Sequence, residues 1–200
     1  MNLLDLIFPK TCLGCGGEGK YICENCLAKV RKRGNYQDTT SIFRYEGVIR
    51  KAIIALKYKY STEIAKEVFY ICVKNLKSMN LASKSHLLVP IPLHWHRRNV
   101  RGFNQTEEVG KLIAGGMGWR YRSDLLVKKV STKPQVGLKS STRRENLKDV
   151  FTVSPNILVS KNSRIVLFDD VFTTGSTLSE AAKALKHAGV KKVMGLTIAR

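Results

Sequence analysis

Acidic residues are scarce in this chain, and their scarcity is the first guide to its partners. The 200 residues include 15 Asp and Glu against 35 Lys and Arg, which gives a formal net charge of +20. A chain this basic attracts polyanions. We expect nucleic acid as a partner, with pyrophosphorylated sugars as the small-molecule equivalent. A solvated basic surface is the alternative, but the cations cluster at residues 31–33, 97–101, 128–129 and 143–144.

Long apolar runs, internal repeats and low-complexity tracts are also missing. No apolar stretch approaches the roughly 20 residues that span a bilayer. The first ten residues, MNLLDLIFPK, lack the basic lead of a signal peptide. With 44% hydrophobic residues the chain can bury a core, and its length suits one domain with a small appendage. We therefore expect a cytoplasmic protein without a membrane span.

Cysteine is present in a small number, and four of the five form two pairs with two-residue spacers. Four cysteines at such spacing match structural Zn²⁺, which takes four thiolates in a tetrahedron. Disulfides or a redox pair are alternatives, but thiols stay reduced in the cytoplasm. Cys72 lies on an apolar helical face and is expected in the core. The predicted zinc ligands, in a finger-like segment 1–34, are Cys12, Cys15, Cys23 and Cys26.

The run IVLFDDVFTTGST at residues 165–177 carries the densest chemistry in the chain. Apolar residues predict a buried strand, two acids follow, and a hydroxyl-rich turn leads into a helical pattern from residue 176. Backbone N–H groups at a helix start favour an anion. Carboxylates beside them suit sugar hydroxyls or hydrated Mg²⁺. Together these groups predict a site for a sugar that carries a phosphate, although a plain capped strand–loop–helix is the alternative.

A second dense segment runs from Pro90 to Gln105. Two aromatic side chains stand there among arginines, the combination that stacks bases and neutralises phosphates in single-stranded nucleic acid. Asn104 is predicted to cap the next helix with Glu107 as its partner. The residues predicted to bind nucleic acid are Trp95, Arg97, Arg98, Arg101, Phe103, Arg143 and Arg144.

Strands alternate with helices along residues 35–200, which predicts an α/β fold with a mostly parallel sheet covered on both faces. Ligands bind such sheets beyond the carboxyl ends of the strands. Residues 35–40 are expected to form a polar linker and residues 131–149 a loop region. The expected strands are 41–45, 86–91, 124–130, 164–169 and 191–198, and the expected helices are 48–58, 62–77, 104–114 and 176–188.

Taken together these segments resemble the ComF family, phosphoribosyltransferase-like proteins with an N-terminal zinc finger. The resemblance rests on the double CxxC, Lys-Tyr at 57–58, Pro-Ile-Pro-Leu at 90–93, Arg-Gly-Phe-Asn-Gln at 101–105, a spaced set from Gln135 to Phe151, and residues 169–177. It implies a type I phosphoribosyltransferase fold. For relatives in transformable bacteria it also implies a role in DNA uptake, with single-stranded DNA and a helicase as partners.

The resemblance also implies roles for the residues of a site for phosphoribosyl pyrophosphate (PRPP). Asp169 and Asp170 would hold the ribose 2- and 3-hydroxyls. The 5-phosphate would lie in a cradle formed by Thr173, Thr174, Gly175, Ser176 and Thr177.

Two further hypotheses stand beside a competence-type protein. In a working transferase, Mg²⁺ and PRPP would bind, and Lys57 and Arg101 would stabilise the departing pyrophosphate, with Asp169 and Asp170 orienting the ribose. In a basic scaffold, the sugar site would be vestigial. The charge and the aromatic–arginine segment favour the first hypothesis.

Overall fold

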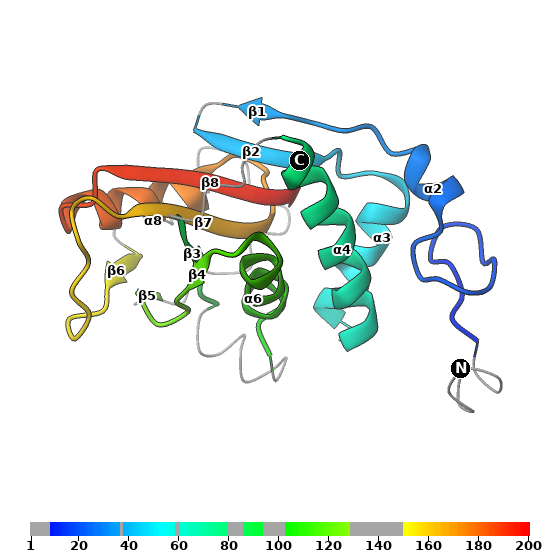
Figure 1. Ribbon diagram of the computed structural model, residues 1–200, viewed down its shortest axis with the longest axis horizontal. Helices are drawn as coiled ribbons and strands as arrows, with labels where there is room; N and C mark the ends of the chain where they lie inside the picture. Colours follow the sequence, from blue (N-terminus) through cyan, green and yellow to red (C-terminus); the bar gives the residue numbers. More distant parts are fainter. Residues whose placement is uncertain (1–8, 37, 59–60, 80–85, 94–102, 129–149) are drawn as a thin grey trace.

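A six-stranded sheet organises the part of the chain that the computed structural model describes, namely residues 9–36, 38–58, 61–79, 86–93, 103–128 and 150–200. Its strand order is β1-β2-β8-β7-β3-β4 (Figure 1). β1 is antiparallel to β2, and the other neighbouring pairs are parallel. The predicted α/β fold with a mostly parallel sheet is confirmed.

The strands of this sheet are short at its edges and long at its centre. The bounds are β1 (Asn35–Tyr36), β2 (Thr39–Phe43), β3 (His86–Pro90), β4 (Arg120–Tyr121), β7 (Arg164–Val171) and β8 (Lys192–Ala199). The expected polar linker at residues 35–40 is wrong, because β1 and the first residues of β2 pair there as a hairpin. β7 also continues two residues beyond the expected end, so both acids belong to the strand.

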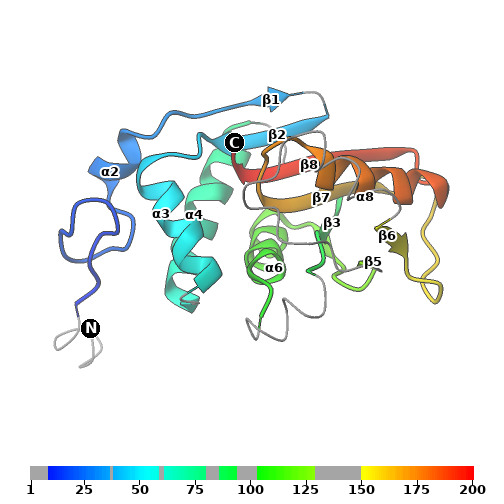
Figure 2. The ribbon, with the colours of Figure 1, turned by 180° about the vertical axis from the view of Figure 1, so that it is seen from behind.

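Helices cover both faces of the sheet. They are α2 (Glu24–Ala28), α3 (Gly47–Tyr58), α4 (Thr62–Ser78), α6 (Gln105–Met117) and α8 (Ser176–His187). The predicted cap of α6 is confirmed: Asn104 accepts a hydrogen bond from the Thr106 amide at 3.0 Å and donates to Glu107 at 3.0 Å. Figure 2 shows α8 in front of β7 and β8.

Alternation along the central strands divides the apolar core in two. Val166 and Phe168 of β7 pack with α3, α4 and α6, whereas Ile165 and Leu167 pack with α8. Successive strand residues point to opposite faces, so a run of apolar residues serves both layers.

A second, two-stranded sheet lies on the α8 side. It consists of β5 (Leu126–Lys128) and β6 (Phe151–Val153), paired antiparallel. The strand expected at 124–130 therefore exists in part, but it belongs to this hairpin-like pair and not to the main sheet. Phe151 and Leu126 are buried in the α8-side core.

The N-terminal segment packs at one end of the molecule, beside α3 and α4 (Figure 1). Ile22 and Val30 lie in the same apolar core as the inner faces of these helices. Glu67 of α4 accepts hydrogen bonds from the amides of Tyr21 at 3.1 Å and Ile22 at 2.8 Å. Among the described residues, none of the helices has the length and hydropathy needed to cross a membrane.

Candidate functional site

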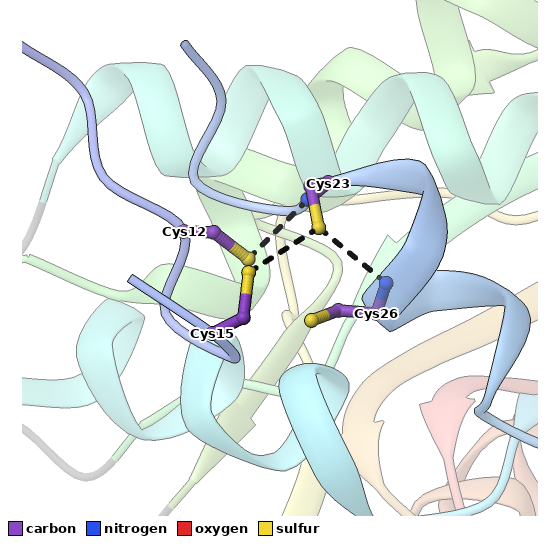
Figure 3. A group of neighbouring side chains, drawn as sticks. All are labelled: Cys12, Cys15, Cys23 and Cys26. Carbon is purple, nitrogen blue, oxygen red and sulfur yellow. Dashed lines mark hydrogen bonds between the residues drawn. The ribbon is translucent and has the colours of Figure 1, made fainter. Parts of the chain in front are cut away.

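The four paired cysteines converge on one point. Cys12 and Cys15 come from one loop, and Cys23 and Cys26 from the start of α2 (Figure 3). All four sulfurs lie within 4.8 Å of one another. The Cys15 and Cys23 sulfurs are 3.8 Å apart, which matches the edge of about 3.8 Å of a tetrahedron with Zn–S bonds near 2.3 Å. We call this set the cysteine cluster.

Backbone amides of the cysteine cluster point at its sulfurs. Gly14 donates to the Cys12 sulfur at 3.3 Å, and Cys26 to the Cys23 sulfur at 3.4 Å. A Cβ added at Gly14 would lie 2.6 Å from the Cys26 sulfur, so only glycine fits this turn. Such donors stabilise thiolates, the form in which sulfur binds a metal.

The pKa values of the cysteine cluster diverge. Burial alone would raise the pKa of Cys12, but backbone hydrogen bonds lower it to about 6. Side-chain hydrogen bonds with Cys23 and Cys15 raise the pKa of Cys26 to about 12. The donor set fits a thiophilic cation such as zinc. Cys72 lies apart, buried in the apolar core as predicted, and burial raises its pKa to about 12.

The two acids at the end of β7, which we call the acid pair, have different surroundings. Asp170 is buried, and its Oδ2 accepts from Lys57 Nζ of α3 at 2.8 Å. Consecutive strand residues point to opposite faces, so the half-buried Asp169 faces away from α3. The Asp170 amide donates to Asp169 Oδ1 at 2.8 Å. The structure therefore brings Lys57 and the acid pair together.

Asp169 holds its proton far more tightly than an ordinary aspartate. Burial and the charge of Asp170 raise the pKa of Asp169 to about 7, against the opposing effects of the Asp170 amide, Lys57 and Lys128. Burial and a neighbouring carboxylate make a second negative charge unfavourable at this position. The acid pair therefore favours a ligand that supplies hydrogen-bond donors or a cation.

Sequence reasoning missed Gln105 as a member of this site. Gln105 begins α6 and is buried, and its Nε2 donates to Asp170 Oδ2 at 3.1 Å, the oxygen that Lys57 also contacts. The motif at residues 101–105 offered a signal, since a buried amide next to a helix cap needs a partner. The sequence alone does not show that the partner is 65 positions away.

The turn from β7 into α8 is open on one side. Gly175 has φ +77 and caps α8 without a side chain, and a Cβ there would lie 2.6 Å from the Phe172 ring. The Thr174 and Ser176 hydroxyls are 2.8 Å apart. Thr173 and Thr174 are exposed. Amides of the first helical turn and the exposed side chains of Thr173 and Thr174 thus meet at one end of α8, an arrangement that accepts an anion.

Most residues predicted to bind nucleic acid lie outside the described residues. Phe103 is described and half-buried. The others, and with them the predicted catalytic Arg101, remain predictions: Trp95, Arg97, Arg98, Arg101, Arg143 and Arg144.

Known proteins resemble the chain along most of its length, although no family model matches it. Competence protein F of Haemophilus influenzae is 27% identical over 94% of this chain and 84% of its own length. DNA utilization protein YhgH of Salmonella typhi is 29% identical over 91% of this chain and 80% of its own length. Competence protein ComFC of Bacillus subtilis is 26% identical over 84% and 65%. The names and coverage of these relatives support the ComF family assignment that the sequence motifs predicted.

Solved structures similar to this chain include adenine phosphoribosyltransferases. That of Trypanosoma brucei, in complex with AMP, pyrophosphate and ribose-5-phosphate, has a TM-score of 0.48 and 15% identity over 83% of this chain and 73% of its own. That of Leishmania tarentolae has a TM-score of 0.42 and 19% identity over 72% and 60%. The fold described above stands on the strands and helices of this chain alone.

Proposed function

We propose that this protein handles DNA in the manner of competence proteins, and that it binds a phosphoribosyl ligand such as PRPP together with single-stranded DNA. The names of its relatives, which refer to competence and DNA utilization, support the biological role. The junction of β7 and α8 supports the ligand. There the acid pair and a helix start whose N-cap, Gly175, has no side chain lie within the nine residues 169–177.

In this proposal each end of the ligand meets complementary groups. The 5-phosphate accepts hydrogen bonds from amides and hydroxyls of residues 173–177, where the helix dipole favours negative charge. The acid pair accepts hydrogen bonds from the ribose hydroxyls. Lys57, which lies 2.8 Å from Asp170, is proposed to contact the pyrophosphate. Mg²⁺ accompanies PRPP and offsets the remaining charge of the pyrophosphate.

The cysteine cluster is proposed to hold structural Zn²⁺. Four sulfurs leave no open coordination position, so its role is to fold the N-terminal segment and not to catalyse a reaction. Reduced thiols suit the cytoplasmic location that we also propose. A helicase partner stays a prediction.

Calorimetry with Mg²⁺ and PRPP tests the phosphoribosyl site. We expect binding by the unaltered protein and at least a tenfold loss in Asp170→Asn, because the buried oxygen no longer carries the charge that pairs with Lys57. Asp124→Asn is the matched control, since that exposed carboxylate pairs with Arg122 away from β7. Absence of PRPP binding at millimolar concentration would remove the phosphoribosyl part of the proposal and favour a vestigial site.

Fluorescence anisotropy with a labelled oligonucleotide tests the DNA part. Binding is expected at low salt, with log affinity falling by about 0.7 per neutralised phosphate as log salt rises. A protein of net charge +20 that shows no binding at low salt would contradict this part.

An active transferase is the second candidate, and the Lys57–Asp170 contact favours it because a cation already stands beside the acid pair. In that reaction the bond from ribose C1 to pyrophosphate breaks and a bond from C1 to a nucleophile forms. Pyrophosphate release with bases, ammonia and sugars as acceptors tests it. Release at an unchanged rate in Asp169→Ala and Asp170→Ala would remove the acid pair from the mechanism.

A further inference from the structure

A groove on the α8 face of the sheet extends from the β7–α8 turn to β1. Its volume is about 740 Å³. Thr174, Gly175 and Ser176 line one part of it, and Tyr36 and Phe172 line another. Leu167 contributes to its floor from the sheet, and Asp169 lies two residues further along the same face of β7. The groove thus adjoins the side proposed to bind phosphate.

Three side chains from separate segments meet at this groove: Tyr36 and Phe172 line it, and Arg200 contacts both rings. The Tyr36 and Phe172 rings contact edge to face, with centroids 5.8 Å apart. The Arg200 guanidinium carbon lies 3.6 Å from the centre of the Tyr36 ring and 5.2 Å from that of Phe172. Phe172 is buried, whereas Tyr36 keeps 44% of its surface exposed. We call Tyr36, Phe172 and Arg200 the aromatic platform.

The chemistry of the aromatic platform suits a flat heterocycle. Arg200 lies over the Tyr36 ring, Phe172 contacts the ring edge to face, and Tyr36 still keeps 44% of its surface exposed. A nucleobase stacks on such a surface whatever its sequence, and a guanidinium beside it adds cation–π attraction. A large exposed ring fixed by two neighbours also loses little entropy when it stacks.

The groove is lined by equal numbers of cations and anions, so its donors for a phosphate lie at the helix start. Lys183 and Lys186 of α8 line it, together with Asp38 and Glu180. Glu180 is already held by Lys183 at 2.6 Å. The hydroxyls of Thr174 and Ser176 add donors at the end next to the helix start.

We propose that the aromatic platform of Tyr36, Phe172 and Arg200 stacks a nucleobase whose phosphate lies at the β7–α8 turn. The inference rests on the proposed function, because it supplies a base site beside the phosphate site. The base belongs either to a single strand or to a free nucleotide, and both share the chemistry of a base on a phosphorylated sugar.

The experiment compares oligonucleotides with and without bases. Anisotropy is measured for a labelled oligonucleotide and for an abasic strand of equal length, on the full zinc-loaded protein. In Tyr36→Ala we expect affinity for the oligonucleotide to fall about 5- to 150-fold, while affinity for the abasic strand is unchanged. Tyr36→Phe should retain binding. Tyr70→Ala is the matched control, since Tyr70 of α4 is 66% exposed and lies outside the groove.

A second arm titrates a nucleoside monophosphate against ribose 5-phosphate. Tyr36→Ala should weaken binding of the nucleoside monophosphate and leave binding of ribose 5-phosphate unchanged. If the protein binds no oligonucleotide yet binds the nucleotide through Tyr36, the platform stands with a free nucleotide as its ligand, and the DNA part of the proposed function fails.

Two outcomes with Tyr36→Ala overturn the aromatic platform. One is unchanged binding of base-containing ligands in Tyr36→Ala, and the other is an equal loss for ligands with and without bases. The first leaves the proposed function intact when the unaltered protein binds PRPP and DNA. Failure of the unaltered protein to bind any base-containing ligand removes the platform and the DNA part together, and PRPP calorimetry then decides the phosphoribosyl part separately.

Discussion

The cysteine cluster and the acid pair both gather groups that repel one another when ionised, but the chain supports them differently. The cysteine cluster is closed: its sulfurs face one another, and nearby amides donate to them. The acid pair is open: Asp170 has two partners from distant helices, and Asp169 keeps a raised pKa. A closed set suits a permanent ion, whereas an open one suits a ligand that arrives and leaves.

The largest effect is expected when one sulfur of the cysteine cluster is removed. Cys23→Ser removes one of four sulfurs, so bound zinc should fall from one equivalent to none and stability should fall by several kcal/mol. Metal analysis and thermal unfolding measure both. Cys72→Ala is the control: it leaves a small cavity in the core but should retain the zinc. Full zinc content in Cys23→Ser would show that the cysteine cluster is not the metal site.

The next effect concerns the open site. Gly175→Ala forces a left-handed backbone at φ +77 onto a Cβ that also meets the Phe172 ring, so we expect a loss of about 2–3 kcal/mol in stability and at least tenfold in PRPP affinity. Gly189→Ala is matched, because φ is +91 but the Cβ meets only the flexible Lys161 at 3.6 Å. Equal PRPP binding in both variants would contradict a role for the turn. Calorimetry measures the PRPP affinity, and thermal unfolding measures the stability.

A smaller effect follows from the pKa of Asp169. The carboxyl is neutral below about pH 7, and ribose hydroxyls donate to its ionised form, so PRPP affinity should rise up to tenfold per pH unit from pH 6 towards pH 7 and then level off. Asp170 raises this midpoint, and Lys57 and Lys128 oppose it. Calorimetry in Asp169→Asn isolates the effect, because titration of the ligand phosphate is common to both proteins. Identical pH profiles would exclude Asp169 from the site.

The smallest expected effect on PRPP affinity comes from the single hydrogen bond between Gln105 and Asp170. Gln105→Met keeps the volume but removes the donor to Asp170, so PRPP affinity should fall about fivefold, in line with roughly 1–2 kcal/mol for a bond to a charged group. Calorimetry measures this affinity. Lys111→Met, on the exposed side of α6, should leave the affinity unchanged. PRPP affinity that stays the same in Gln105→Met would reduce Gln105 to a packing residue.

Local patterns made much of the molecule predictable. Both CxxC pairs bring their own sulfurs close, since a two-residue spacer fixes their separation. The strand, turn and helix around residues 165–188 follow from apolar runs and helical spacing. Asn104 was recognisable as a cap because its partners lie within three positions.

Contacts between distant segments were not predictable. Gln105 and Asp170, and likewise Tyr36 and Arg200, meet only because the tertiary fold brings together segments far apart in the sequence. The strand at residues 126–128 pairs with β6 and not with the main sheet. Its side chains alternate with a period of two in either case, so the sequence pattern does not reveal its partner. Edge strands of two residues, such as Arg120–Tyr121, are too short to leave a pattern.

The apolar core that Ile22 and Val30 share with α3 and α4 has a practical consequence. A fragment that begins after residue 34 would leave the partners of these side chains open to water, and a fragment that ends there would have little to fold against. Removal of the proposed zinc ion from the cysteine cluster should therefore destabilise α3 and α4 as well. The two parts of the chain should melt in one step, as a single cooperative unit.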